Sequence, residues 1–245
     1  MRDYKKETEK RIKFIREAME KAHADGIVFG NSGGKDSALV GILCKMATDN
    51  VLGVIMPCQS KRNFGEDMED GLDVARQFGI ENITVDLTAA KEELLSKIEA
   101  VSTANDAAKG NIAPRLRMTT LYTIAQSRNA MVAGTGNKCE IFMGYFTKWG
   151  DGAYDINPIA DLTVTEIYEF LRYLNAPSNI IEKAPSAGLF EGQTDEDDMG
   201  VTYAQIEEVI STGKTDDGAA RDKILGANSR TEHKRRMPLV YKDEK

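Results

Sequence analysis

The sequence has little cysteine and no long hydrophobic run. Its three cysteines, Cys44, Cys58 and Cys139, are widely separated and form no C-x-x-C pair, which argues against a disulfide framework and against a structural zinc site. The longest apolar run, ALVGILC at residues 38–44, is far shorter than the roughly 20 residues that span a bilayer. The charged N-terminus has no apolar stretch behind it and does not resemble a signal peptide. We therefore expect a cytoplasmic protein that does not enter a membrane.

Positive charge is also scarce. The chain has 32 Lys and Arg against 39 Asp and Glu, a net charge of −7, whereas binding to a nucleic acid depends on many basic side chains that neutralise phosphates. We expect no nucleic-acid partner. The chain has 245 residues, of which 41% are hydrophobic, enough for a substantial core. Because neither an internal repeat nor a linker is evident, we expect one domain over residues 1–245.

Apolar residues alternate between strand-like runs and helical spacing. Alternating strands and helices predict parallel strands joined by right-handed crossovers, which gives an α/β fold with a Rossmann-like, doubly wound open parallel sheet and flanking helices. Ligands bind such sheets beyond the carboxyl ends of the strands. The predicted strands cover residues 26–30, 51–57, 82–87 and 129–136, and the predicted helices cover residues 4–22, 37–46, 65–78, 89–105 and 111–129. A further helix is predicted from the capping box at residues 163–166 to before Pro177, and residues 185–200 are predicted to form a loop.

The segment VFGNSGGKDSALV, residues 28–40, follows the first predicted strand. A Walker loop, G-x-x-x-x-G-K-[ST], needs four residues between its glycines and a hydroxyl after the lysine. Here only three residues separate Gly30 from Gly34, and Asp36 stands in place of the hydroxyl, so transfer of the γ-phosphate is a poor fit. Glycines at a helix N-terminus still suit an anion, and Asp36 is compatible with a phosphate if a divalent cation lies between them. The alternative is a plain turn that joins a strand to a helix.

Further polar residues follow the fourth predicted strand. Glu140 is a second carboxylate that could share a cation with Asp36, although it would equally suit a solvated helix. Lys148 precedes a glycine turn and would suit an anion, and Asp155 would suit a ribose hydroxyl; each is also compatible with an exposed surface charge. Arg115 and Arg117 are two residues apart on a predicted helix, so only one of them is expected to face a ligand. The cluster EHKRR at residues 232–236 is either a binding element or a solubilising end.

The pattern S-G-G-x-D-S after a strand resembles the PP-loop of the N-type ATP pyrophosphatases. The resemblance implies an adenine nucleotide alpha hydrolase-like fold and cleavage of ATP between its α and β phosphates. The loop would hold the leaving pyrophosphate while a substrate oxygen takes the AMP. The loop alone does not identify the substrate.

Four downstream blocks, residues 111–118, 134–162, 185–203 and 229–238, resemble the ammonia-dependent NAD synthetases. They occur in that family's order, and with the loop they cover nearly the whole chain. The resemblance implies a C–N ligase that amidates deamido-NAD to NAD with ammonia, through an acyl-adenylate, releasing AMP and pyrophosphate without a covalent enzyme intermediate. It implies ATP as co-substrate, Mg²⁺, and a homodimer with the substrate site between its subunits. One synthetase domain would use the whole chain, leaving no glutaminase domain.

The resemblance also implies roles for individual residues. Asp36 and Glu140 would hold Mg²⁺, and Arg115 would reach the substrate across the dimer interface. Deamido-NAD would contact Arg115, Lys148, Asp155, His233 and Lys234. ATP would contact Gly30, Asn31, Ser32, Gly33, Gly34, Lys35, Asp36, Ser37, Thr135 and Ser186.

Two further features bear on the site. Val164 stands where the family usually has a lysine on ATP, so either a neighbouring cation replaces it or the alignment is shifted there. The candidate lid is SAGLFEGQTDEDDMG, residues 186–200, which would keep water from the acyl-adenylate.

Three other protein classes remain as alternatives. A tRNA-modifying PP-loop synthetase would need a basic surface, and its thiolating members would need paired cysteines. A deazaguanine nitrile synthase would need a cysteine-rich zinc site. The acidic charge and scattered cysteines count against both. A non-catalytic ATP-binding sensor would keep the loop without needing Lys148 and Asp155.

Overall fold

The protein is built on a four-stranded parallel sheet. The computed structural model of the chain describes residues 2–58, 65–182 and 194–241, so Ser186 and most of the predicted lid lie outside the described residues. The strands β1 (Gly26–Gly30), β2 (Val51–Ile55), β3 (Glu81–Thr84) and β4 (Ala130–Ala133) pair in the order β3-β2-β1-β4. All three pairings are parallel. The predicted fold class is confirmed.

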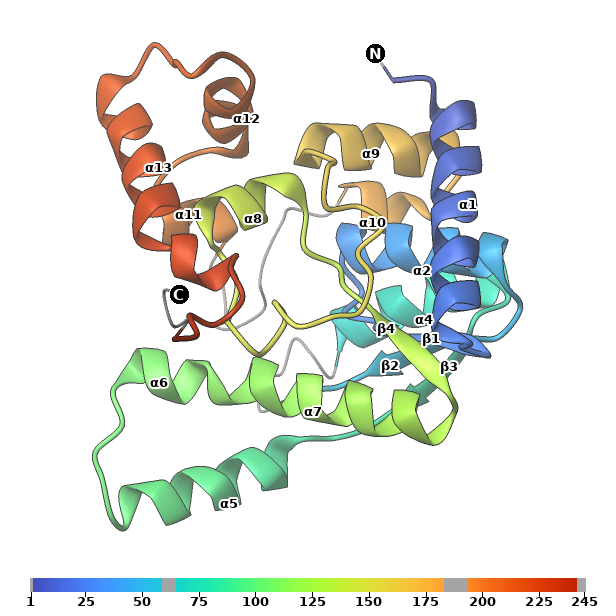
Figure 1. The fold of residues 1–245 in the computed structure, drawn as a ribbon, viewed down its shortest axis with the longest axis horizontal. Helices are drawn as coiled ribbons and strands as arrows, with labels where there is room; N and C mark the ends of the chain where they lie inside the picture. The colour runs from blue at the N-terminus through green and yellow to red at the C-terminus, as the bar shows by residue number, and fades with distance from the viewer. Residues whose placement is uncertain (1, 59–64, 183–193, 242–245) are drawn as a thin grey trace.

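Helices cover both faces of this sheet (Figure 1). On one face α2 (Lys35–Ala47) and α4 (Glu66–Phe78) pack on the strands, and α1 (Tyr4–Ala22) and α9 (Val164–Tyr173) lie behind α2. On the other face lies α7 (Ile112–Ser127), with α5 (Thr88–Glu99) beside it. Each face of the sheet has its own hydrophobic core, and alternate residues of β1 point into the two cores. Phe29 packs in the core under α2, and Val28 packs in the core under α7. The sheet is therefore buried on both sides, as parallel sheets require.

The order of the strands indicates which edge of the sheet is suited to bind a ligand. The chain runs from β1 to β2 in one direction and reaches β4 on the opposite side of β1. The connections after β1 and after β4 therefore leave the sheet at its topological switch point, where doubly wound folds bind ligands. Residues 31–34 and residues 134–137 form the first parts of these two connections.

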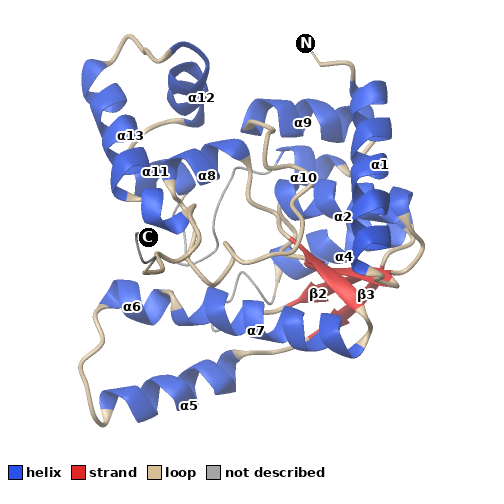
Figure 2. Cartoon of the chain, in the orientation of Figure 1, coloured by secondary structure: helices blue, strands red, loops and turns tan. Residues whose placement is uncertain are grey.

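A second layer of helices follows the sheet in the sequence (Figure 2). It contains α8 (Lys138–Met143), α11 (Asp195–Met199), α12 (Tyr203–Thr212), α13 (Gly218–Arg230) and the short 3₁₀ helix η1 (Glu232–Lys234). Their apolar side chains share a separate core that includes Cys139, Ile206 and Ile224. Two short helices, α6 (Asp106–Gly110) and α10 (Ser178–Glu182), complete the described structure.

Several predicted boundaries are wrong. The helix predicted over 89–105 ends at Glu99, and a new helix, α6, begins after the N-cap Asn105. Strands β2 and β3 end before the predicted residues 57 and 87.

The loop predicted over 185–200 is wrong at its end, because residues 195–199 form α11. The sequence does carry the signals of this helix. The side chain of Thr194 caps the Asp197 amide, four acidic residues follow in the first turn, and Gly200 ends the helix at φ 58°. The helix has no apolar periodicity because it has only five residues.

None of the helices in residues 2–58, 65–182 and 194–241 is both long and apolar enough to cross a membrane.

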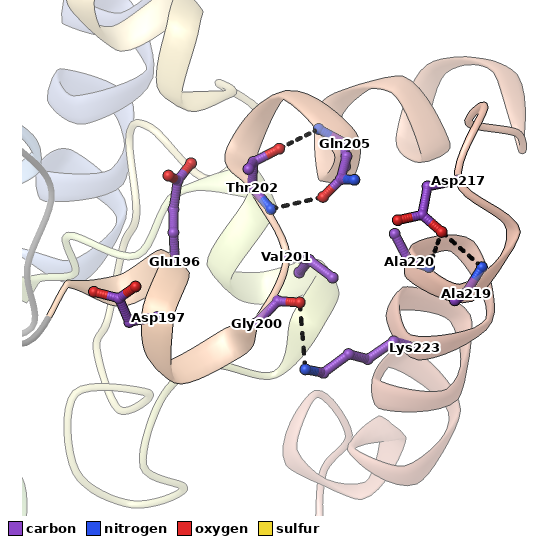
Figure 3. A pocket seen from close by; sticks show the side chains of 10 residues that line it. All are labelled: Glu196, Asp197, Gly200, Val201, Thr202, Gln205, Asp217, Ala219, Ala220 and Lys223. Atoms are coloured by element: carbon purple, nitrogen blue, oxygen red, sulfur yellow. Dashed lines mark hydrogen bonds between the residues drawn. The ribbon is translucent and has the colours of Figure 1, made fainter.

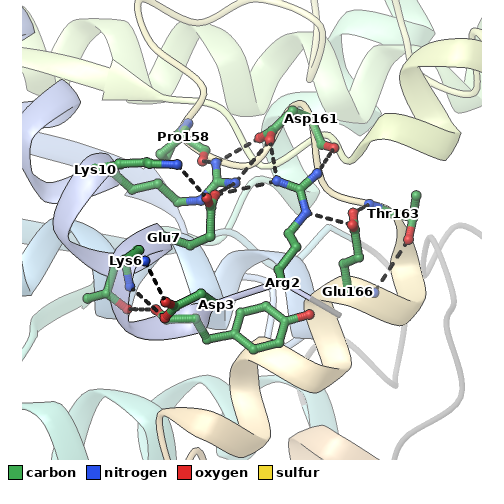
Figure 4. A network of polar contacts seen from close by, with 12 residues as sticks. Arg2, Asp3, Lys6, Glu7, Lys10, Pro158, Asp161, Thr163 and Glu166 are labelled. Carbon is green, nitrogen blue, oxygen red and sulfur yellow. Dashed lines mark hydrogen bonds and ion pairs between the residues drawn. The ribbon is translucent and has the colours of Figure 1, made fainter.

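A network of ion pairs joins α1 to the segment that leads into α9 (Figure 4). Arg11 Nη1 donates to Asp161 Oδ1 at 2.7 Å and to the Pro158 carbonyl at 2.5 Å. Arg2 donates to Asp161 Oδ2 at 3.0 Å and to Glu166 Oε1 at 2.6 Å. Because Glu166 also accepts from the Thr163 amide, the network fixes the start of α9 against α1.

The variant Asp161→Asn is expected to lower the free energy of unfolding by roughly 1 kcal/mol at pH 7, a small effect because exposed pairs are screened and the Asp161 side chain is 56% exposed. Burial alone would raise the pKa of Asp161, but the hydrogen bonds and charges of Arg11 and Arg2 hold it below its ordinary value. A carboxyl group whose pKa is lower in the folded protein stabilises the fold at pH values above its unfolded-state pKa of about 3.9. This stabilisation is lost as the pH falls through the pKa of the folded state. Urea denaturation should therefore show a difference from wild type at pH 7 that shrinks by pH 3. A difference that grows in acid, or an equal loss in Asp222→Asn on α13, would contradict this assignment.

Candidate active site

The loop between β1 and α2 is anchored to α4. The Asn31 side chain is buried, and its Nδ2 donates to the Gly71 carbonyl at 3.0 Å and to Asn82 Oδ1 at 2.9 Å. Gly33 has a φ of 71°, and a Cβ there would lie 1.9 Å from the Asp67 carbonyl oxygen. Only glycine fits this position, since the conformation is left-handed and the backbone of α4 is too close.

The N-terminus of α2 is left open by this loop. Its N-cap is Gly34, which has no side chain to bond the first amides of the helix. Ser32 Oγ accepts from the Gly34 amide at 3.3 Å and lies 3.1 Å from Ser37 Oγ. Unbonded amides at a helix start together with two hydroxyls suit a phosphate group.

Asp36 and Glu140 come together from different helices. Asp36 Oδ1 accepts from Asn137 Nδ2 at 3.3 Å, and Glu140 Oε2 accepts from the Asn137 backbone amide at 3.0 Å. Burial raises the pKa of Glu140 well above its ordinary value, the charge of Asp36 raises it further, and Lys35 opposes both effects. The two carboxylates, called the carboxylate pair below, are therefore close enough to repel each other.

Lys35 lies within this group of charges. Its side chain is 6% exposed, and its Nζ donates to Asp36 Oδ2 at 2.6 Å. Burial would lower the pKa of Lys35, but the charges of Asp36 and Glu140 outweigh burial and raise it. Lys35 Nζ is also 5.7 Å from the centre of the Tyr203 ring, and Tyr203 donates its hydroxyl proton to Asp195 at 2.9 Å. Helices α11 and α12 thus contact the loop through Tyr203, a contact that the sequence did not indicate.

The donor set of the carboxylate pair fits a divalent cation shared with a nucleotide. The described residues contain no group of three or more His, Cys, Asp or Glu side chains placed to hold a metal. Mg²⁺ usually binds proteins through one or two carboxylates and takes its other ligands from water and substrate phosphates. Burial and, after it, the charge of Asp36 disfavour the ionised form of Glu140 and raise its pKa, and a cation bound between the two carboxylates would oppose both effects.

Four of the five residues predicted to bind the substrate lie together. Arg115 of α7 makes a long hydrogen bond to the Lys148 carbonyl at 3.5 Å, and Lys148 Nζ donates to the His233 carbonyl at 2.6 Å. Lys234 Nζ donates to the carbonyls of residues 144 and 146 at 2.8 and 2.7 Å. We call these four residues the basic group. Three segments that are far apart in the sequence meet here.

The other predicted contacts lie along β4. Asp155 accepts from the Tyr122 hydroxyl at 3.1 Å and from the Val132 amide at 2.7 Å, and no described contact joins it to the basic group. Thr135 follows β4 in the connection at the switch point. Arg117 is half-buried and donates from Nε to the Met56 carbonyl, whereas Arg115 is exposed. That only one of the two arginines faces a ligand stays a prediction.

A strained tryptophan lies beside the basic group. Trp149 has a φ of 62° and is 47% exposed, and Lys148 Nζ is 5.3 Å from its ring centre. A bulky residue with positive φ is uncommon, and such strain clusters at functional sites. Sequence reasoning identified the glycine turn but missed this residue, because positive φ is expected at glycine.

The model of the family described as NAD synthase matches residues 7–238. The chain belongs to the NAD synthase family. It is 45% identical to the NH(3)-dependent NAD(+) synthetase of Carboxydothermus hydrogenoformans, over 97% of this chain and 98% of that protein. It is 39% identical to the protein of the same name from Archaeoglobus fulgidus, over 97% of each chain.

Two solved structures share the fold over nearly the whole chain. An NMN synthetase from Francisella tularensis has a TM-score of 0.92 at 37% identity and covers 98% of this chain and 99% of its own. An NH3-dependent NAD synthetase from Campylobacter jejuni has a TM-score of 0.79 at 31% identity and covers 99% and 100%.

Val164, where the resemblance implied a missing lysine, is a buried position. The side chain is 5% exposed and belongs to the apolar core that also contains Cys139 and Met199. The first residue of α9 therefore packs against the apolar core of the second helical layer and is not part of a charged surface. Cys139, next to Glu140, is fully buried, and burial raises the pKa of its thiol to about 12, which excludes it as a nucleophile at neutral pH.

A surface pocket of about 430 Å³ lies between α11, α12 and α13. Figure 3 shows Lys223 extending across it to the Gly200 carbonyl, a bond of 3.3 Å. None of the residues predicted to bind ATP, metal or substrate lines this pocket.

Proposed function

We propose that this protein is an ammonia-dependent NAD synthetase, a ligase that amidates deamido-NAD to NAD with ATP and ammonia. One observation carries the proposal: the carboxylate pair and an open phosphate-binding loop meet at the switch point of the sheet. Membership of the NAD synthase family, with relatives named NH(3)-dependent NAD(+) synthetase at 45% identity, supports the choice of substrate and nitrogen donor.

The reaction needs activation of a carboxylate. A nicotinate carboxylate resists attack by ammonia, because its charge repels the nucleophile and an oxide is a poor leaving group. Attack of the carboxylate on the α phosphorus of ATP forms an acyl-adenylate and releases pyrophosphate. Ammonia then adds to the acyl carbon, a proton is lost to water, and AMP leaves as the amide forms.

The protein's part in these steps is positioning and charge neutralisation. The amides at the start of α2 and the hydroxyls of Ser32 and Ser37 would bind the departing pyrophosphate. Asp36 and Glu140 would hold Mg²⁺, which when bound offsets the negative charge of the phosphates. Lys35, held beside Asp36, supplies a further positive charge at the same place. No covalent link to the protein is needed.

The basic group would bind the phosphates of deamido-NAD. Lys148 and Arg115 present positive charge beside Trp149, a combination that suits phosphates next to an aromatic base. We further propose a homodimer with the substrate site between its subunits, so that the basic group of one subunit, Arg115 included, reaches across the interface to the deamido-NAD bound by its partner. Helix α5, next to α7, has no buried residue. Leu94 on α5 and Val101 just after it are 41% and 86% exposed, which supports a contact surface on this part of the protein.

We propose that residues 1–245 act as one synthetase domain on free ammonia, as the names of the relatives indicate. We place the reaction in the cytoplasm, where the three free cysteines would stay reduced.

A mononucleotide substrate is the second candidate, because a structure with a TM-score of 0.92 is that of an NMN synthetase. The test is to incubate the protein with ATP, Mg²⁺, ammonium and either deamido-NAD or nicotinate mononucleotide, and to follow amide, AMP and pyrophosphate. We expect NAD, AMP and pyrophosphate in equal amounts, with the higher kcat/KM on deamido-NAD. A preference for the mononucleotide would make the protein an NMN synthetase, and the absence of amide from both substrates would refute the proposal.

The variant Lys148→Met is expected to raise the KM for deamido-NAD about 10- to 100-fold with little change in the KM for ATP. The reason is that a hydrogen bond to a charged group contributes about 1.5–3 kcal/mol, and each 1.4 kcal/mol is tenfold in affinity. Steady-state kinetics with each substrate varied in turn would measure the effect, with Lys21→Met on α1 as control. An equal rise in both KM values would place Lys148 outside the substrate site.

A further inference from the structure

Asn137 connects the two carboxylates that are proposed to hold the cation. It is the N-cap of α8, and its side chain is 0% exposed. Its Nδ2 donates to Asp36 Oδ1 at 3.3 Å, and its backbone amide donates to Glu140 Oε2 at 3.0 Å. One residue thus contacts both members of the carboxylate pair, which come from α2 and α8.

The orientation of the Asn137 amide is determined by its neighbours. Oδ1 accepts from the backbone amides of Cys139 and Glu140, both at 3.0 Å. Both of these groups are donors and the Asp36 carboxylate is an acceptor, so only one placement of the side-chain oxygen and nitrogen satisfies all three contacts. The side chain therefore holds Glu140 by capping its helix and holds Asp36 by donating to it.

Capping alone does not require asparagine at this position. Serine, threonine and aspartate cap helices about as well, and α1 and α13 of this chain use the exposed aspartates Asp3 and Asp217. An ionised aspartate has no donor, and serine and threonine would have to accept and donate through a single oxygen close to the backbone. Of these four residue types only asparagine has its acceptor and its donor on two separate atoms, so that Oδ1 can accept the two amides while Nδ2 donates to Asp36. A buried polar group is costly unless it is fully bonded, and Asn137 is bonded at both ends of its side chain.

We infer that Asn137 is a positioning residue that fixes Asp36 and Glu140 relative to each other and thereby sets the affinity of the site for a divalent cation. The inference rests on the proposed function, in which this pair holds Mg²⁺. Asp36 is held through both oxygens, by Lys35 on Oδ2 and by Asn137 on Oδ1. Carboxylates that are ordered in advance lose less side-chain freedom when a ligand binds.

The test compares Asn137→Ser with wild type and with Asp217→Ser. Serine can still cap α8 but is too short to reach Asp36. Asp217 is a matched control, because it caps α13 by accepting from two backbone amides in the same way and lies at an exposed position. Binding of Mn²⁺ would be measured by electron paramagnetic resonance in the presence of α,β-methylene ATP, whose α–β link is not cleaved. We expect the Kd for Mn²⁺ to rise about 10- to 100-fold in Asn137→Ser, the usual effect of losing a residue that orients a metal ligand.

A second measurement separates positioning from folding. In Asn137→Ser the Mg²⁺ concentration for half-maximal turnover should rise by a similar factor, and turnover should recover at high Mg²⁺. A purely structural role would lower the folded fraction without shifting this dependence. If the serine variant does not fold, Asn137→Asp keeps the shape and the cap but replaces the donor, and its Mg²⁺ dependence should shift at least about fivefold in either direction.

The outcomes distinguish this inference from the proposed function. A Kd for Mn²⁺ within twofold of wild type in folded Asn137→Ser, an unshifted Mg²⁺ dependence in Asn137→Asp, or no binding of Mn²⁺ by the wild type would each overturn it. A wild-type protein that binds Mn²⁺ with the analogue but forms no NAD would contradict the proposed function and leave the role of Asn137 intact.

Discussion

Replacement of Asp36 by asparagine is expected to lower the rate of pyrophosphate release at least about 1000-fold. A bound metal contributes several kcal/mol of charge stabilisation in the transition state, and each 1.36 kcal/mol is about tenfold in rate. Asparagine keeps the shape of the side chain but removes one of the two charges of the carboxylate pair. Release of labelled pyrophosphate from ATP in the presence of deamido-NAD, before ammonium is added, measures this first step alone.

The same variant also has a structural effect that must be measured separately. Asp36 pairs with the buried ammonium of Lys35 at 2.6 Å, and removing one partner of a buried pair costs about 3–5 kcal/mol. The charge of Glu140 still acts on Lys35, so we expect a loss near the lower end of this range and a folded protein at 25 °C. Circular dichroism would verify the fold, and Asp217→Asn on α13 is the matched control. Pyrophosphate release within tenfold of wild type would remove Asp36 from the cation site.

Replacement of Gly33 by alanine is expected to abolish nucleotide binding and to lower the free energy of unfolding by at least about 2 kcal/mol. The left-handed backbone alone costs a non-glycine residue about 1–2 kcal/mol. The new Cβ would also lie 1.9 Å from the Asp67 carbonyl oxygen, so the loop or α4 must move. Calorimetry with α,β-methylene ATP and urea denaturation would measure the two effects.

Gly34→Ala is the natural comparison, one residue away. Gly34 has a φ of −93°, and its Cβ would meet only the Ser32 side-chain oxygen at 3.3 Å. We therefore expect a loss of stability below about 1 kcal/mol, as for ordinary surface substitutions. If the two alanine variants lost equal stability, the left-handed conformation at Gly33 would not be what makes glycine necessary.

The order of strands and helices could be predicted because each is encoded locally. The apolar runs of β1 and β2 and the helical spacing of α9 are visible over a few residues, and the glycines and Asp36 mark the loop. The predictions failed where the local signal was short. Helix α11 has five residues and no apolar stripe, so its N-cap and C-cap were not enough to distinguish it from a loop.

The contacts within the site depend on tertiary structure and left little trace in the sequence. Asn137 and Asp36 are 101 residues apart, and nothing near either residue indicates that they touch. The place of Glu140 after the fourth predicted strand made it a candidate to share a cation with Asp36, and the resemblance to a family implied the same, but its spacing from Asp36 along the chain does not distinguish it from an exposed helical residue. Lys35 was expected on ATP, and its burial against Tyr203 depends on the packing of α12, which a local pattern does not encode.

The position of Trp149 has a practical consequence. It is the only tryptophan in the 245-residue sequence, and it lies half-exposed with the Lys148 ammonium 5.3 Å from its ring. Indole emission from the whole protein therefore originates beside the basic group and nowhere else. The chain therefore carries a built-in optical reporter beside the basic group, whereas the loop between β1 and α2 contains no tryptophan.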